Sequence, residues 1–122
     1  MEDSNLPLPA YEKEERPWGT FERFTHGEPT TVKIIVVRTG EALSLQSHTK
    51  REEFWRVLDG SGFVTVGETR VPATEGQEFF IRKNTKHRAE GGTENLRFLE
   101  ISFGDFDEND IVRYEDKYNR DK

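Results

Sequence analysis

Residues 39–60 read TGEALSLQSHTKREEFWRVLDG, a stretch that combines turn residues with an alternation of apolar and polar side chains. It opens with a turn at Gly40 and closes with an Asp-Gly pair, and both are residues that break strands and form tight turns. Between these turns apolar and polar residues alternate, which is the pattern of a β-strand with one buried face. The stretch therefore predicts two short strands with a turn at each end.

The same alternation brings three polar side chains toward one place. Successive residues of a strand point to opposite faces, so we expect Gln46 and His48 to share one face while Leu43 and Leu45 take the other. Glu53 lies five residues after the histidine and begins the next apolar run. If that run forms a neighbouring antiparallel strand, the carboxylate of Glu53 can reach the pocket that Gln46 and His48 face.

The composition limits the class of protein. A chain of 122 residues is one domain, and 32% apolar against 34% charged residues predicts a small core, which nine Phe, two Trp and three Tyr can fill. The net charge of -6 argues against nucleic-acid and anionic-membrane binders, which need a positive surface. Without cysteine, thiolate chemistry and disulfides are excluded. No secretory signal or apolar span is evident, so a cytoplasmic location is expected.

Outside the opening stretch, residues 32–38 are a β-branched run, which we expect to be buried on both faces. Residues 1–15 are predicted to form a flexible or draped arm, with the domain at 16–122, and residues 109–114 a helical turn or a strap. Further short strands are expected at 20–24, 61–66, 69–72, 78–81, 87–90 and 96–103. Many short strands with glycine turns predict an all-β single-domain barrel or jelly roll.

Four polar residues form a candidate metal site: Gln46, His48, Glu53 and His87. Two imidazoles, a carboxylate and an amide oxygen suit Zn, Mn, Fe, Co or Ni and leave positions for water or substrate oxygens. Spacing alone is equally consistent with ordinary polar positions and a surface charge.

The residues also resemble a known family. The first cupin motif is matched by Gly40-x5-Gln46-x-His48-x4-Glu53-x6-Gly60, with Gln46 in place of its first histidine, and a degraded second motif by Gly76-x5-Arg82-x-Asn84-x2-His87. More narrowly, the chain is similar to the cupin domain of type II phosphomannose isomerases, often fused behind a mannose-1-phosphate guanylyltransferase. The matching pieces include Arg16-Pro17-Trp18-Gly19, Arg51-x-Glu53-x-Trp55, His87-Arg88 and Asp110-Ile111-Val112-Arg113-x2-Asp116-x-Tyr118-x-Arg120.

The resemblance implies a double-stranded β-helix that binds one divalent ion, with Zn the first choice, and forms a homodimer. It implies interconversion of mannose 6-phosphate and fructose 6-phosphate. Lys33 is the first candidate for the base, because burial in a strand disfavours its charged form; the alternative is that it lies at a strand end and reaches water. Glu100 is either a second acid/base or a paired charge. Basic residues beside the two ligand segments predict an anion site. The phosphate-binding candidates among them are Arg51, Arg88 and Lys86, and Arg51 is also a catalytic candidate.

Two alternatives stay open. Phe54 stands where the resembling enzymes usually carry histidine, and the second motif is altered. Both features favour a non-catalytic cupin that binds a sugar or sugar phosphate. The other alternative is a different metal-dependent cupin enzyme, such as an oxygenase or another sugar isomerase.

Overall fold

The computed structural model describes residues 8, 10–104, 107 and 109–118. This part of the chain is all-β, as predicted, and contains eleven strands. They are β1 (Glu12–Arg16), β2 (Gly19–Arg23), β3 (Thr30–Val37), β4 (Leu45–Ser47), β5 (Arg51–Asp59), β6 (Gly62–Val66), β7 (Thr69–Ala73), β8 (Glu78–Ile81), β9 (His87–Gly91), β10 (Leu96–Gly104) and β11 (Val112–Glu115). The described residues include no helix long and apolar enough to cross a membrane.

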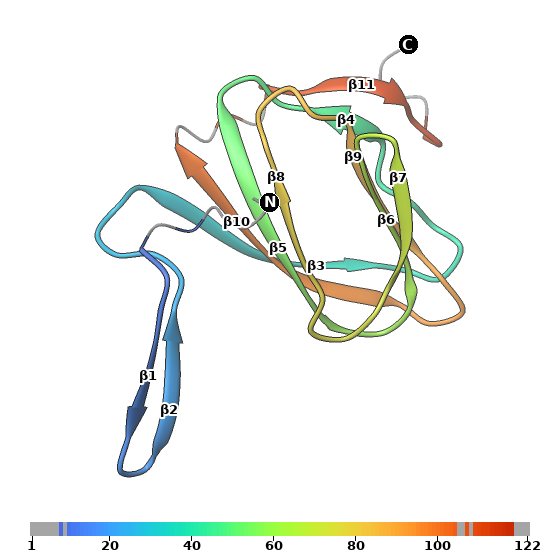
Figure 1. Cartoon of the computed structure of the whole chain (residues 1–122). Helices are drawn as coiled ribbons and strands as arrows, with labels where there is room; N and C mark the ends of the chain where they lie inside the picture. The colour runs from blue at the N-terminus through green and yellow to red at the C-terminus, as the bar shows by residue number, and fades with distance from the viewer. Residues whose placement is uncertain (1–7, 9, 105–106, 108, 119–122) are drawn as a thin grey trace.

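Two larger sheets face each other and enclose the interior of a barrel (Figure 1). One has the strand order β3-β10-β5-β8 and the other the order β11-β4-β9-β6-β7. The prediction that the strands of Gln46 and Glu53 are neighbours is wrong, because β4 pairs with β9 and β11 whereas β5 pairs with β10 and β8. Their side chains converge across the barrel interior, between the sheets.

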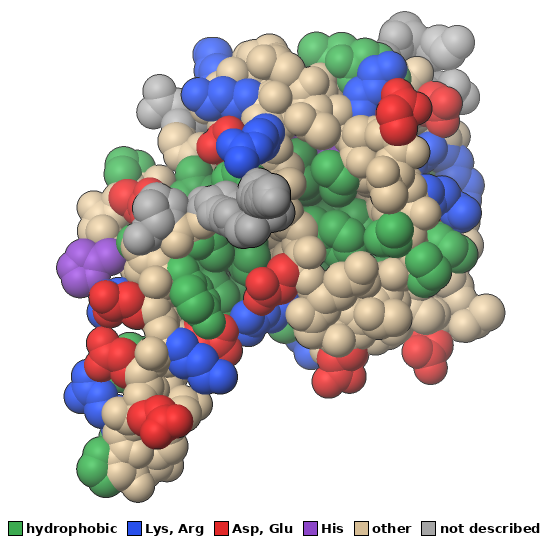
Figure 2. Space-filling model, in the orientation of Figure 1, with side chains coloured by type: hydrophobic (Ala, Val, Ile, Leu, Met, Phe, Trp, Pro, Cys, Tyr) green, Lys and Arg blue, Asp and Glu red, His purple; other side chains and the backbone are tan. Residues whose placement is uncertain are grey.

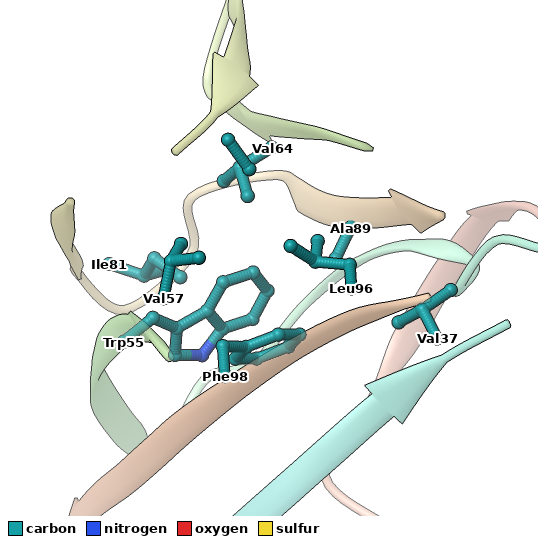
Figure 3. Close-up of a cluster of buried hydrophobic side chains, with 9 residues drawn as sticks. Val37, Trp55, Val57, Val64, Ile81, Ala89, Leu96 and Phe98 are labelled. Carbon is teal, nitrogen blue, oxygen red and sulfur yellow. The ribbon is translucent and has the colours of Figure 1, made fainter. Parts of the chain in front are cut away.

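The apolar core fills one part of this interior. Trp55 and Phe98 stack with their ring centroids 4.4 Å apart, and smaller aliphatic side chains surround them (Figure 3). Leu96 and Phe98 are fully buried, and Val57 and Val64 nearly so. Because each buried side chain of this size contributes about 1.5–3 kcal/mol, this cluster supplies much of the stability of the barrel.

Strand β3 departs from the sequence prediction on its outer face. Val32, Ile34 and Val36 are 58%, 58% and 52% exposed, so the expectation of burial on both faces is wrong. The inward residues Ile35 and Val37 do pack on the core. The physical reason is that only the inner face of β3 packs on the core, whereas its outer face is turned to solvent. The homodimer stays a prediction.

Two segments at the ends of the chain add strands. Residues 12–16, most of them in the predicted arm, form β1 in a hairpin with β2 that projects from the barrel (Figure 1). Charged side chains are spread along this hairpin (Figure 2). At the other end β11 pairs with β4. Of the helical turn and the strap expected for residues 109–114, the structure therefore shows the strap. Residues 1–7 and 9 of the predicted arm lie outside the described residues.

Candidate metal centre

A cavity of about 160 Å³ lies between the two sheets. Seven of the residues that line it are site residues predicted from the sequence. They are Lys33, Gln46, His48, Arg51, Glu53, His87 and Glu100. The remaining lining residues are Ile35, Leu43 and Trp55. The structure thus brings the predicted metal ligands and the predicted catalytic residues together in one cavity.

The centre of the cavity is a buried cluster of three potential ligands. His48, Glu53 and His87 each offer one ligand atom, and these atoms lie within 4.8 Å of one another. The Nε2 atom of His48 is 3.5 Å from one carboxylate oxygen of Glu53, and the Nε2 atom of His87 is 3.6 Å from the other. All three side chains are at least 95% buried. Two nitrogens and a carboxylate at this spacing fit a transition-metal ion such as Zn²⁺.

Backbone carbonyls fix the orientation of both histidine rings. The Nδ1 atom of His48 is 2.7 Å from the carbonyl oxygen of Asp110, and that of His87 is 2.9 Å from the carbonyl oxygen of Thr85. A carbonyl only accepts, so Nδ1 carries the proton in both rings and Nε2 keeps its lone pair. Burial lowers the pKa of both histidines, which favours the neutral imidazole that metals bind.

The fourth predicted ligand, Gln46, comes from β4, whose register places it opposite His87. Leu43 also lines the cavity, so the expectation that it takes the face opposite to Gln46 is wrong. The alternation fails there because regular strand structure begins only at Leu45. Gln46 lines the same cavity as the three buried ligands, and its amide oxygen as a fourth ligand stays a prediction.

Two neighbours hold the carboxylate of Glu53 from either side. Arg51 donates from Nε to one oxygen at 2.9 Å, and the indole N–H of Trp55 donates to the other at 3.0 Å. Arg51 Nη2 also lies 3.2 Å from His48 Nε2. Burial works to raise the pKa of Glu53, but His87 and Arg51 outweigh it and lower the pKa, so Glu53 is ionised.

Glu100 on β10 lies beside this cluster. It is 5% exposed and pairs across the sheet with Lys33 on one side and Trp55 on the other. Burial, followed by the nearby charge of Glu53, raises the pKa of Glu100 to about 8. A buried carboxyl that holds its proton near neutral pH is suited to proton transfer.

Lys33 lines the cavity but is exposed, so the expectation that it is buried within its strand is wrong, and the alternative in which it reaches water is the one that the structure shows. Lys86 and Arg88 lie elsewhere, outside the set of described residues that line the cavity. The ammonium of Lys86 stands 4.5 Å from the ring centroid of Tyr114. Arg88 follows the inward His87 on β9, and its guanidinium binds the carbonyl of Leu43 and the carboxylate of Glu115.

The family model for the mannose-6-phosphate isomerase C-terminal region matches residues 6–116. The chain belongs to this family. A similar relative is the xanthan biosynthesis protein XanB of Xanthomonas campestris, 40% identical over 107 residues, which cover 86% of this chain and 23% of the relative. Another is mannose-1-phosphate guanylyltransferase 2 of Escherichia coli O157:H7, 37% identical over 108 residues, which cover 87% of this chain and 22% of the relative. The chain thus spans less than a quarter of these relatives.

Solved structures agree on the fold. A putative sugar phosphate isomerase from Acidithiobacillus ferrooxidans has a TM-score of 0.56 and 25% identity, covering 61% of this chain and 49% of that chain. A cupin protein from Bacteroides fragilis has a TM-score of 0.55 and 18% identity, covering 80% of this chain and 86% of that chain. The predicted cupin fold is therefore confirmed for this member of the mannose-6-phosphate isomerase C-terminal family.

Phe54, which stands where the resembling enzymes usually carry histidine, points away from the cavity. It is 4% exposed on the outer face of β5, with its ring centroid 5.6 Å from that of Phe24. Glu53, one residue earlier, points inward to the ligand cluster. The replacement therefore changes the packing beneath Phe24 and leaves the ligand set intact.

The most connected residue that sequence reasoning did not assign is Asp110. Its carboxylate accepts hydrogen bonds from Thr49 and Lys50, directly after His48. Burial opposes ionisation, but these bonds lower the pKa of Asp110 to about 2. Asp110 begins the last family-like segment of the sequence, yet no spacing rule links it to a histidine 62 residues earlier.

Proposed function

We propose that this chain catalyses the interconversion of mannose 6-phosphate and fructose 6-phosphate, using one divalent metal ion. The observation that carries the proposal is a single cavity that unites the buried cluster of His48, Glu53 and His87 with a protonated Glu100 and the cation of Arg51. Membership of the mannose-6-phosphate isomerase C-terminal family supports the substrate class.

The metal would be held by His48, Glu53 and His87, with the amide oxygen of Gln46 beside them. Once bound, a divalent ion supplies positive charge that polarises a sugar carbonyl. Burial favours the neutral form of both histidines, and backbone carbonyls already aim both rings at the centre of the cluster.

Proton transfer is assigned to Glu100. In an aldose–ketose interconversion, one group removes the proton from C2 of the aldose, an enediol forms, and the proton returns to C1. Glu53 is unsuited because its oxygens are engaged by Arg51 and Trp55. Glu100 lies on the same inner face, and with a pKa of about 8 a fraction of it is ionised near neutral pH. That carboxylate can take the C2 proton, and the carboxylic acid so formed returns the proton to C1.

Positive charge for the phosphate comes from Arg51 and Lys33, the two basic residues among the described lining residues. Arg51 is 92% buried and Lys33 is exposed, so their charges extend from the ligand cluster to solvent. We expect Arg51→Ala to raise the KM for the sugar phosphate about tenfold or more, since one charge-assisted hydrogen bond is worth about 1.5–3 kcal/mol. Arg88→Ala, on the outer side of β9, is the matched control and should change KM less than twofold.

A coupled assay that follows fructose 6-phosphate formation tests the proposal. Metal-loaded protein should turn over mannose 6-phosphate, a chelator should abolish the activity, and added metal should restore it. Glu100→Gln, which keeps the shape but cannot take a proton, should lower kcat by about 100-fold or more while metal content is unchanged. Absence of turnover with every divalent metal would end the proposal.

A second candidate is a non-catalytic cupin that binds a sugar or sugar phosphate. The observation in its favour is size: about 160 Å³ is less than the roughly 300–1,000 Å³ of typical ligand pockets, so part of a hexose phosphate would lie outside. Thermal stabilisation by mannose 6-phosphate without turnover would support this function, because a ligand that binds only the folded state raises apparent stability.

A further inference from the structure

The segment of residues 110–115, called the C-terminal clasp below, contacts the part of the chain that carries two candidate ligands. Its strand β11 pairs with β4, with Arg113 opposite Gln46. The hydroxyl of Tyr114 lies 2.9 Å from that of Ser47. The clasp thus follows residues 45–48 from one side, although more than 60 residues separate the two segments in sequence.

Asp110 makes four hydrogen bonds to residues 48–50, three through its carboxylate and one through its backbone carbonyl. One carboxylate oxygen accepts from the backbone N–H of Thr49 at 2.9 Å and from its hydroxyl at 2.7 Å. The other oxygen accepts from the backbone N–H of Lys50 at 2.8 Å. The carbonyl oxygen of the same residue receives Nδ1–H of His48 at 2.7 Å.

These four bonds form a closed arrangement. The carboxylate fixes the chain immediately after His48 to Asp110, and this fixes the distance between the histidine ring and the carbonyl of Asp110. Because Asp110 is 8% exposed, water does not readily replace these partners. The ring therefore has one orientation and one tautomer, with its unprotonated Nε2 directed at Glu53 and Arg51.

We propose that Asp110 is a positioning residue of the metal centre, which sets the tautomer and direction of His48 through the loop at Thr49 and Lys50. The proposal deepens the proposed function, since it concerns the same cluster of His48, Glu53 and His87. It assigns a role to the beginning of the C-terminal clasp, whose residues are not among the described residues that line the cavity. Residues that orient a metal-binding histidine in this way typically change metal affinity by about 10- to 100-fold when removed.

The test compares Asp110→Ala with Asp107→Ala. Asp107 lies in the same loop and carries the same charge, but its carboxylate contacts Asn109 and Lys50 Nζ rather than the backbone after His48. Titration with Co²⁺, followed by visible absorption, should show about 10- to 100-fold weaker binding in Asp110→Ala and less than twofold change in Asp107→Ala. Equal affinity in Asp110→Ala and wild type would overturn the proposal.

A second measurement on the metal-free protein separates positioning from general destabilisation. Nitrogen-15 NMR of the imidazole should show a single Nδ1–H tautomer for His48 in the wild type and a mixture in Asp110→Ala, while His87 keeps its Nδ1–H form. Asp110→Asn should fall between them, because its carbonyl can accept from Thr49 whereas its amide faces the donor of Lys50. An unchanged tautomer in a folded Asp110→Ala protein would contradict the proposal even if its melting temperature fell.

The two measurements also distinguish this proposal from the proposed function. If wild-type protein bound no Co²⁺, the metal centre would be refuted, and the tautomer measurement would still decide the role of Asp110. If wild-type protein bound Co²⁺ but catalysed no isomerisation, the positioning role would be tested by affinity as before. Should Asp110→Ala fail to fold, Asp110→Asn provides both readouts.

Discussion

The barrel interior has two ends of opposite character, built on the same two strands. Along the inner face of β5, the ionised Glu53 is followed by Trp55 and then by the apolar Val57. Along β10 the inner face changes from Glu100 to Phe98 in the same way. One end holds the candidate metal centre and the other holds the core. The residues that carry the candidate chemistry and those that stabilise the core are therefore only two positions apart along each strand.

Trp55 joins the two ends. Its ring stacks on Phe98 with centroids 4.4 Å apart, and its N–H donates to Glu53 at 3.0 Å. The apolar end stabilises the fold by removing side chains from water. The polar end opposes folding at Glu100, because burial and the nearby charge of Glu53 disfavour its ionised form. Substitutions at the two ends should therefore have opposite consequences for the metal-free protein.

The largest effect on stability is expected at the apolar end. Phe98→Ala removes a fully buried ring from the core and leaves a cavity, so the free energy of unfolding of metal-free protein should fall by about 3–5 kcal/mol. Urea denaturation measures this value. Co²⁺ affinity of the folded variant should stay within about threefold of wild type. A loss of less than 1 kcal/mol in the free energy of unfolding would mean that the apolar end does not supply the stability assigned to it.

A smaller effect of opposite sign is expected at the polar end. The pKa of Glu100 is raised from 4.5 to about 8, so between these pH values the unfolded carboxyl is ionised while the folded one keeps its proton. The folded state then binds more protons, and stability falls as pH rises through this window. The side chain of Glu100→Gln does not ionise, so its stability does not fall in this window. The metal-free variant should therefore be more stable than the wild type by roughly 1–3 kcal/mol at pH 8.

Denaturation at pH 4 and pH 8 checks this prediction. The advantage of Glu100→Gln should be small at pH 4, where both states of the wild type are protonated, and should grow toward pH 8. Destabilisation by Glu100→Gln at pH 8 would show that Glu100 supports the fold rather than opposing it.

The smallest effect is expected at the junction. Trp55→Phe keeps an aromatic ring on Phe98 and removes the N–H that binds Glu53. We expect a loss of about 1–2 kcal/mol in stability, from a buried hydrogen bond to a charged group together with a smaller ring. Co²⁺ affinity should also change, by a few-fold, because one oxygen of Glu53 loses a partner. An unaltered Co²⁺ affinity would mean that the hydrogen bond from Trp55 to Glu53 has no influence on metal binding.

Much of the fold could be predicted from local patterns. Alternation and glycine turns located the strands at 61–66, 69–72 and 96–103, because side-chain period and turn chemistry are local properties. The outer face of β3 could not be predicted, since a β-branched run looks the same whether one face of the strand or both faces are covered. Strand β1 was missed because its sequence, EKEER, has no apolar face.

The candidate site was predictable in its ligands and less so in their supports. His48, Glu53 and His87 follow from metal-ligand chemistry and from the family-like motifs, and the structure brings them together. The position of Arg88 was not predictable from charge, because one step along β9 takes a side chain to the other face. The role of Asp110 depends on a contact across 62 residues, which no local pattern contains.

The central claim is that the polar end of the barrel binds a divalent metal through His48, Glu53 and His87. Equilibrium titration of metal-free protein with Co²⁺, compared with His87→Ala, tests it most directly. We expect one equivalent bound by the wild type, with the absorption of a site of mixed nitrogen and oxygen ligands, and loss of that binding in His87→Ala. Equal stoichiometry and equal affinity in the two proteins would contradict it.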